Sequence, residues 1–156
     1  MNSLSSKILL GLALLLIVLQ FFSPDTSVPE YDSSKDFLTI HQPSQEISAI
    51  IQSACYDCHS YKTSYPWYSN IEPISWWLQD HIDEGRDEFN LSMWADYPAD
   101  RADHKLEEAI ELVDAEEMPL PSYTWIHADA RLSNQERQKL SSWFTSLRED
   151  LQQQAQ

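Results

Sequence analysis

The chain has 156 residues, with 10 Lys and Arg against 25 Asp and Glu and a formal net charge of −15. This length suits one modest domain. The acidic balance disfavours nucleic acid and anionic membrane surfaces as partners, because both need clustered Lys and Arg. Hydrophobic residues make up 42% of the chain, which is enough to fill a core. Gly11 and Gly85 are the only glycines, which argues against glycine-rich phosphate-binding and dinucleotide-binding loops.

The first predicted element is an apolar N-terminal segment. Residues 8–22 are apolar except Gln20, and Lys7 is the only charged residue before Asp25. This length lies between a long signal peptide and a comfortable bilayer-spanning helix. Because residues 21–25 offer no small-residue cleavage pattern, we expect residues 1–24 to form an uncleaved signal anchor, with a removed signal peptide as the alternative. Lys7 before the segment and acids after it predict an exported domain at the periplasmic face of the membrane.

The rest of the chain divides into a linker, a domain and a tail. Residues 25–43 mix Ser, Pro and Asp without sustained periodicity, which is typical of a tether. We expect the domain to span residues 44–150 and a polar tail to span 151–156. Apolar residues recur at helical spacing over 47–54, 74–82, 106–113 and 140–147, and no segment alternates as a strand. The capping-box spacing of Ser133 and Glu136 marks the start of the last helix. The pattern predicts a small all-α domain.

The chemistry is concentrated at residues 55–59, which read Cys-Tyr-Asp-Cys-His and contain both cysteines of the chain. This spacing is the attachment signature for c-type haem, in which two thiols bond one edge of the porphyrin and the next residue presents its imidazole to the iron. In an exported chain the same spacing also fits a structural disulfide, a thioredoxin-like redox pair or half a zinc site. The motif follows a helical pattern rather than a strand, and no further cysteines are present. Both facts favour haem.

Here the chain resembles the class I c-type cytochromes, and more closely a family of small cytochrome-like haem-binding domain proteins. A helix leads into the Cys-x-x-Cys-His motif, the pair Met118-Pro119 follows far downstream, and a terminal helix begins at residues 132–136. The closer family is also similar at Pro66-Trp67-Tyr68-Ser69-Asn70-Ile71, Ser75-Trp76-Trp77-Leu78, His81-Ile82, Gly85-Arg86 and Glu117-Met118-Pro119-Leu120. The match covers residues 41–147, although ordinary class I cytochromes contain more glycine. It implies a small cytochrome c-like helical domain around one covalent haem.

The resemblance also implies the ligands. Cys55 and Cys58 would form the thioether bonds, His59 would be the proximal iron ligand and Met118 the distal one. Met118 could instead be an ordinary core methionine, with Met93 a weaker rival. His81 lies on the apolar stripe of residues 74–82 and could be a core residue, an iron ligand or a partner of a haem propionate.

Other residues complete the predicted site. An aromatic cluster should wall the pocket and exclude water, with Trp67, Tyr68, Trp76 and Trp77 as its members. Trp67 or Tyr68 could also hydrogen-bond a propionate, and Arg86 could neutralise one. His104 and His127 are expected at the surface. An acid-rich helix face is expected to be solvated or to dock a basic partner, and it comprises Glu107, Glu108, Glu111, Asp114, Glu116 and Glu117.

These features predict a membrane-tethered monohaem c-type cytochrome-like protein that transfers single electrons to and from a redox partner. No catalytic residue is expected, because the protein would act by ligating and insulating the iron. If Met118 does not bind iron, the open site would suit a peroxidase-like enzyme with His81 as its acid-base group. The other alternative is a sensor of small gas ligands.

Overall fold

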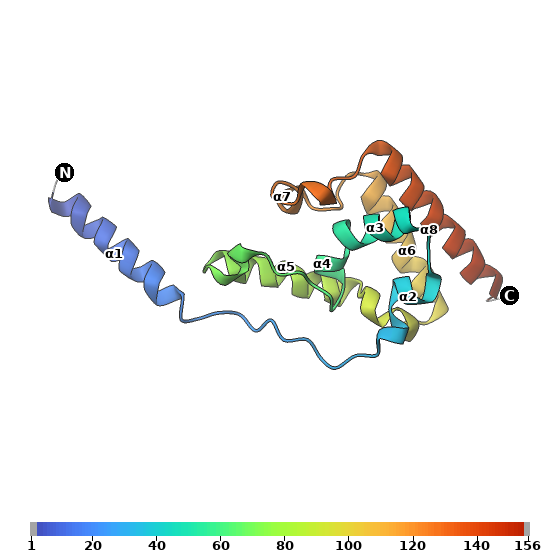
Figure 1. Ribbon diagram of the computed structural model, residues 1–156, viewed down its shortest axis with the longest axis horizontal. Helices are drawn as coiled ribbons and strands as arrows, with labels where there is room; N and C mark the ends of the chain where they lie inside the picture. The colour runs from blue at the N-terminus through green and yellow to red at the C-terminus, as the bar shows by residue number, and fades with distance from the viewer. Residues whose placement is uncertain (1–2, 155–156) are drawn as a thin grey trace.

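The computed structural model describes residues 3–154, and every regular element within that range is helical (Figure 1). The α-helices are α1 (Ser3–Leu19), α2 (Phe37–His41), α3 (Gln45–Ala54), α4 (Tyr56–His59), α5 (Ile74–Glu88), α6 (Ala99–Asp114), α7 (Pro121–Thr124) and α8 (Asn134–Gln154). Four short 3₁₀ helices connect them: η1 (Ser33–Lys35), η2 (Trp67–Asn70), η3 (Leu91–Asp96) and η4 (Ala128–Ala130). The predicted all-α class is confirmed.

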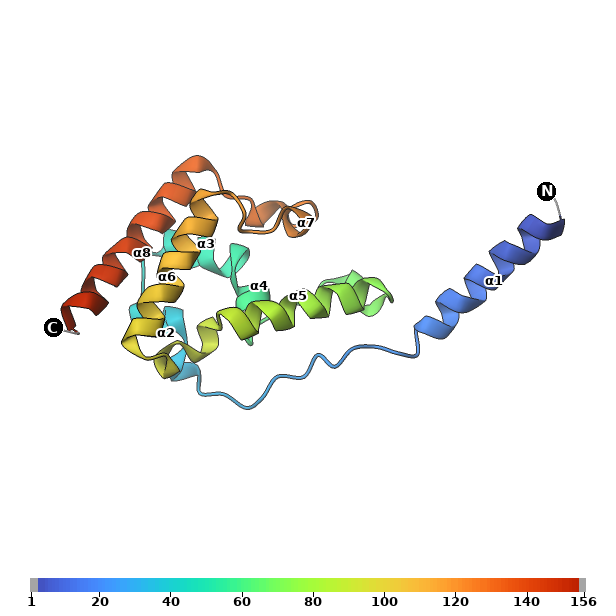
Figure 2. The ribbon, with the colours of Figure 1, turned by 180° about the vertical axis from the view of Figure 1, so that it is seen from behind.

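Helices α6 and α8 form an antiparallel pair that supports the rest of the domain (Figure 2). The cross-links Arg148 to Asp103 and Ser141 to Asp114 join opposite ends of the two helices, as antiparallel packing requires. Helix α3 packs against α8 and places Ile51, which is fully buried, in the same apolar core. The core therefore forms where these three helices meet.

The helix starts follow from local sequence. Ser44 caps α3, and its Oγ accepts a hydrogen bond from the backbone N–H of Ile47 at 3.3 Å. At the start of α8, the backbone N–H of Glu136 donates to Ser133 Oγ at 3.3 Å, and the backbone N–H of Ser133 donates to Glu136 Oε2 at 2.8 Å. This is the capping box that the sequence predicts.

The packed domain extends beyond both predicted ends. Phe37 in α2 is fully buried and makes edge contacts with Trp94 and Trp143, so the core begins well before residue 44. At the other end α8 continues to Gln154, and Leu151 packs against the core. Helix α2 has only five residues, which is too short to show a periodic pattern, and its packing partners lie far along the chain. The sequence therefore gave no reason to separate it from the linker.

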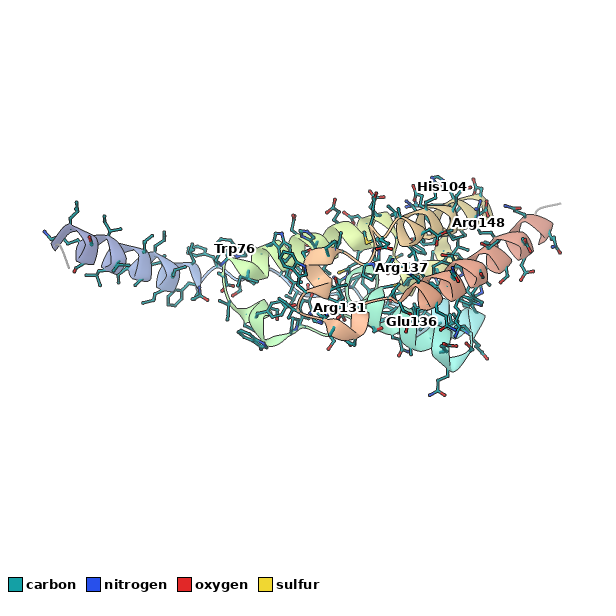
Figure 3. All side chains as sticks on the ribbon, turned by 90° about the horizontal axis from the view of Figure 1, so that it is seen from above. Trp76, His104, Arg131, Glu136, Arg137 and Arg148 are labelled. Carbon is teal, nitrogen blue, oxygen red and sulfur yellow. The ribbon has the colours of Figure 1, made fainter. Side chains whose placement is uncertain are left out.

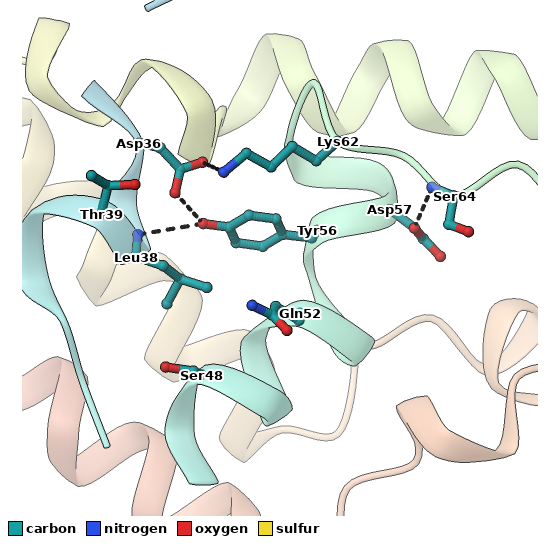
Figure 4. Close-up of a pocket in the computed structure, with 9 residues that line it drawn as sticks. All are labelled: Asp36, Leu38, Thr39, Ser48, Gln52, Tyr56, Asp57, Lys62 and Ser64. Atoms are coloured by element: carbon teal, nitrogen blue, oxygen red, sulfur yellow. Dashed lines mark hydrogen bonds and ion pairs between the residues drawn. The ribbon is translucent and has the colours of Figure 1, made fainter. Parts of the chain in front are cut away.

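Asp36 and Tyr56 attach this N-terminal segment to the cysteine motif (Figure 4). Tyr56 Oη donates to Asp36 Oδ1 at 2.8 Å, and Lys62 Nζ lies 2.9 Å from Asp36 Oδ2. Asp36 is fully buried, and burial together with this carboxylate raises the pKa of Tyr56. These groups line a polar cavity of about 540 Å³ on the side of α4 that carries Tyr56. Because Tyr56 belongs to the motif, the contact fixes the motif against the core.

Helix α1 contains 17 residues and stands apart from the domain core (Figure 1). Between residues 3 and 154, no helix combines the length and the apolar character that crossing a membrane requires. The spanning helix predicted within residues 1–24 is therefore not found in the described part of the chain, and residues 1 and 2 lie outside it.

Candidate functional site

A largely apolar cavity of about 680 Å³ lies between α3, α4 and α5 on one side and α6, the loop after it and α8 on the other. Cofactor sites in proteins are typically ~300–1,000 Å³. Cys55, Cys58, His59 and Met118 all line it, together with apolar residues of the core such as Leu140. The fold therefore brings the motif and the distant methionine to one cavity.

The two cysteines are held by the end of α3 and the single turn of α4. The backbone N–H of Cys55 donates to Ile51 O at 3.0 Å, and that of His59 donates to Cys55 O at 2.9 Å. Both thiols are free, and burial raises the pKa of Cys55 to about 12 and that of Cys58 to about 11. A thioredoxin-like pair depends on a thiol with a lowered pKa, so the geometry opposes that alternative.

The His59 side chain is oriented by α5. Its Nδ1 lies 2.9 Å from Gly85 O and 3.0 Å from Phe89 O, so an N–H at Nδ1 donates to these carbonyls. Burial lowers the pKa of His59, which favours the neutral ring. The unprotonated nitrogen is then Nε2, and a neutral imidazole with its other nitrogen hydrogen-bonded to a carbonyl is the usual form of a metal-binding histidine.

Gly85 allows α5 to approach α4 this closely. A Cβ atom at this position would lie 2.9 Å from Cys58 O and 3.2 Å from both the carbonyl carbon and the Cβ of Cys58. Real Cβ atoms almost never lie within 3.0 Å of another heavy atom, so any side chain at this position would force the backbone of Cys58 or of α5 to shift. The only glycine of the domain thus lies where α5 reaches His59 and Cys58.

Met118 is presented by the end of α6. Glu116 adopts a left-handed conformation with φ of 60°, and its N–H donates to Val113 O at 3.2 Å. The N–H of Glu117 donates to Leu112 O at 2.9 Å, which completes a Schellman motif. The chain therefore leaves α6 in a defined direction, and Met118 enters the cavity from the α6 side.

Arg137 of α8 fixes the same turn (Figure 3). Its Nη1 donates to Val113 O at 2.7 Å and to Met118 O at 2.9 Å. One guanidinium therefore hydrogen-bonds the Val113 carbonyl near the end of α6 and also holds the backbone of the methionine. Nothing in the local sequence around Met118 points to this residue, since it lies on another helix.

Of the residues predicted to surround the cofactor, His81 lines the cavity and five others do not: Trp67, Tyr68, Trp76, Trp77 and Arg86. Its Nδ1 lies 2.8 Å from Trp77 O. Trp67 is 78% exposed and Trp77 is 48% exposed. The Tyr68 hydroxyl lies 2.6 Å from Nε2 of His127.

Arg86 lies outside the cavity lining. Its Nε donates to Ser60 O and its Nη2 to Thr63 Oγ1, each at 2.9 Å, which holds the loop that follows the motif. Trp76, Met93 and His104 also lie outside the cavity lining.

Lys105 is a cavity residue that the sequence did not indicate. It is the only Lys or Arg among the lining residues, and its side chain is only 12% exposed. Its Nζ lies 2.7 Å from Glu108 and 3.4 Å from Glu88, and both carboxylates raise its pKa. Lys105 therefore already has carboxylate partners at the cavity wall. The helical pattern placed Lys105 beside a buried position of α6 but gave no reason to assign it to a cavity.

These residues fit a haem. Two thiols, an oriented neutral imidazole and a thioether line one largely apolar cavity, and Lys105, which is paired with Glu108 and Glu88, lies at its wall. No group of three or more His, Cys, Asp or Glu in residues 3–154 has the arrangement of a site for a bare metal ion. The zinc alternative therefore lacks support in the described structure.

Comparison with known proteins agrees with this fit. No curated protein and no solved structure matches the chain. The sequence model of one family, described as a haem-binding domain, matches residues 14–146, a range that includes the cysteine motif, the aromatic segment and Met118. The chain therefore belongs to the haem-binding domain family.

Proposed function

We propose that this haem-binding protein carries one covalently attached haem c and transfers single electrons. Cys55 and Cys58 would hold the haem by thioether bonds, and His59 and Met118 would be the iron ligands. The bound group supplies an iron that changes between its ferric and ferrous states. The observation that carries the proposal is the meeting of His59, held through Nδ1, and Met118, held by the α6 turn, at one cavity.

The chain's own residues would tune this iron and insulate it. A thioether ligand favours the ferrous state and, together with His59, closes the coordination sphere, which suits electron transfer more than catalysis. Apolar lining from α3, α6 and α8 excludes water, which also raises the reduction potential. No proton needs to move at either ligand.

The peroxidase-like and gas-sensing alternatives depend on His81. It lines the cavity, and its Nδ1 lies 2.8 Å from Trp77 O. However, it lies on α5, one turn before Gly85, whose carbonyl holds His59. A second iron ligand would more readily come from an element other than the helix that already holds His59. We therefore favour Met118, which comes from the α6 side, over His81 as the sixth ligand, and electron transfer over peroxidase-like or gas-sensing chemistry.

Covalent attachment in turn implies export, since c-type haem is joined to reduced thiols outside the cytoplasm. The apolar α1 with Lys7 before it supports delivery to the membrane. We propose the periplasmic face as the place where the domain acts and a redox protein with a basic docking face as its partner.

Acid-acetone extraction of the denatured full chain tests covalent attachment. Haem should stay with the polypeptide of the wild type and be lost from a variant with Cys55→Ala and Cys58→Ala. Haem that extracts freely from the wild type would contradict the proposal.

Substitution of the methionines tests the sixth ligand. Met118→Ala should remove the weak sulfur-to-iron band at the red end of the ferric spectrum, lower the potential and allow carbon monoxide to bind the ferrous form. Met93→Ala is the matched control, because Met93 lies outside the cavity lining. If His81→Ala rather than Met118→Ala opens the iron to carbon monoxide, the assignment of the ligand is wrong.

A further inference from the structure

Charge is distributed unevenly over the domain. Beyond residue 24 the chain carries 25 Asp and Glu against 9 Lys and Arg, yet residues 64–79 and 118–128 contain only one charged residue, Glu72. Glu72 is 2% exposed, so it contributes almost nothing to the surface. We call these two segments the uncharged end. They comprise η2, the first turns of α5 and the α7 region.

The uncharged end is also the most apolar surface of the domain. Trp125 is 80% exposed, Trp67 78% and Ile126 66%, and Ile71, Ile74 and Trp77 are exposed as well. The two segments lie at the end of the domain that faces α1 (Figure 1), and the hydrogen bond of Tyr68 with His127 joins them. Large exposed apolar patches of this kind mark interaction sites, because soluble surfaces rarely carry them without function.

The end of α1 is attached to the same place. Gln20 Nε2 donates to Glu72 O at 3.1 Å, and the backbone N–H of Glu72 donates to Gln20 Oε1 at 3.3 Å. Trp76 Nε1 donates to Phe22 O at 2.5 Å, and Figure 3 labels Trp76 beside the end of α1. The exposed Phe21 and Phe22 therefore adjoin the apolar surface of the domain.

Helix α1 needs an apolar surrounding. Its residues from Ile8 to Leu16 are all exposed, and none carries a charge. A helix that is apolar on all sides is stable only when it is buried, yet the large apolar side chains of α1 are 51–69% exposed in the described chain from Leu4 to Val18. The surrounding that accepts such a helix is the hydrocarbon of a lipid bilayer.

We propose that the uncharged end lies against the interface of a lipid bilayer that surrounds α1. Trp side chains favour this interface, since their rings are apolar and their N–H groups can reach water or headgroups. The absence of exposed charge removes the cost of bringing ions to a region of low dielectric constant. The surplus of acids elsewhere selects a zwitterionic surface over an anionic one. This contact does not depend on the haem and does not require α1 to cross the membrane.

A spin-label experiment on the full-length holoprotein tests the contact. A nitroxide is attached at Trp125→Cys in one variant and at Gln152→Cys in the other, which serves as a matched exposed control at the far end of α8. Wild-type holoprotein treated with the same reagent is the control for label that reaches Cys55 or Cys58, which are free and partly buried. The proteins are bound to phosphatidylcholine vesicles, and collision with lipid-soluble oxygen is compared with collision with a water-soluble nickel chelate.

The label at position 125 should collide several-fold more with oxygen than with the chelate, relative to the label at position 152. If both labels show the same water-like ratio on vesicles that still bind the protein, the uncharged end remains in water or faces a protein, and the proposal is overturned.

A second measurement uses charge. Ile126→Asp should lower the vesicle partition coefficient on the order of tenfold, the loss expected for withdrawing one apolar side chain, whereas Gln152→Asp should not. Equal partition of the two variants would also refute the contact. The haem content and absorption spectrum of every variant report separately on the proposed function.

Discussion

Replacing Gly85 by Ala tests whether the contact between α5 and the cysteine motif is as close as the structure has it. In an exposed helix interior this change stabilises a protein by about 1 kcal/mol, since Ala has the higher helix propensity. Here the new Cβ would lie 2.9 Å from Cys58 O and 3.2 Å from its carbonyl carbon. Those atoms are backbone and cannot turn aside. Such overpacking costs about 1–3 kcal/mol, and the upper end applies where backbone must shift.

The expected net effect of Gly85→Ala is therefore a destabilisation of about 2 kcal/mol. Urea denaturation of the ferric holoprotein, followed by far-ultraviolet circular dichroism, measures it. Asp80→Ala serves as the control, because Asp80 is exposed on the same helix. The His59 ring should also move, since Gly85 O accepts its Nδ1–H, and the ferric spectrum should change. A Gly85→Ala protein as stable as the wild type would show that α5 is not in such close contact with the cysteine motif.

Three further predictions concern charged groups. Lys105→Gln should lower the haem reduction potential measured by voltammetry, because a nearby positive charge favours the ferrous state. Lys139→Gln, at the surface, should leave the potential unchanged. Arg137→Gln should make the sulfur-to-iron band weaken at lower urea concentrations than those that unfold the helices, since Arg137 holds Met118 O. Burial lowers the pKa of His41. As the pH falls, His41 is therefore protonated in the unfolded chain before it is protonated in the folded protein. The free energy of unfolding should decrease as the pH drops below ~6.5. His41→Phe should make the free energy of unfolding, measured by urea denaturation, less dependent on pH in this range.

The sequence was sufficient to predict elements whose stabilising contacts are local. The apolar stripe that includes Leu140 and Phe144, with the Ser133 and Glu136 capping box before it, predicted α8. The spacing of two thiols and an imidazole likewise needs no tertiary information. All of these signals lie within a few turns of one helix.

Helix α5 illustrates where a local pattern is insufficient. The sequence suggested an inward stripe that included Ile74 and Trp77, but both are exposed, while Ser75 and Gln79 are buried. The Gln79 side chain is satisfied by Tyr65 and Asp83, so its burial carries little penalty. Periodicity assumes that apolar side chains face the protein. At the uncharged end they face outward, and this surface was therefore assigned to the cofactor pocket.

Long-range contacts were also beyond sequence reasoning. Arg137 reaches the Met118 turn from another helix, and Lys105 reaches the cavity because α6 packs beside α8. In sequence, each is a Lys or Arg on the polar face of a helix. Their specific roles depend on the tertiary packing of the helices, which the local sequence does not reveal.

Two groups of acids differ in how they can act on a redox partner. On the acid-rich helix face, Glu107 pairs with Arg148 and Glu108 with Lys105, so these two charges are partly neutralised within the domain, while Asp114 accepts a hydrogen bond from Ser141. Glu84 and Glu111 are exposed, line the cavity and have no ion pair among the described residues. A basic partner should therefore be attracted to the edge where the cavity meets solvent.

Electron exchange with a small basic redox protein tests this attraction. The rate should fall steeply as ionic strength rises from ~10 mM, where charges act over ~30 Å, to ~150 mM, where they act over ~8 Å. Glu84→Gln combined with Glu111→Gln should flatten this dependence, because both charges lie where the partner must come closest to the cofactor. Glu149→Gln, on the distant part of α8, should change the rate less, since attraction at that face does not shorten the path for the electron. If removing Glu149 flattens the dependence as much as removing the cavity pair does, then net charge rather than a docking face governs the encounter.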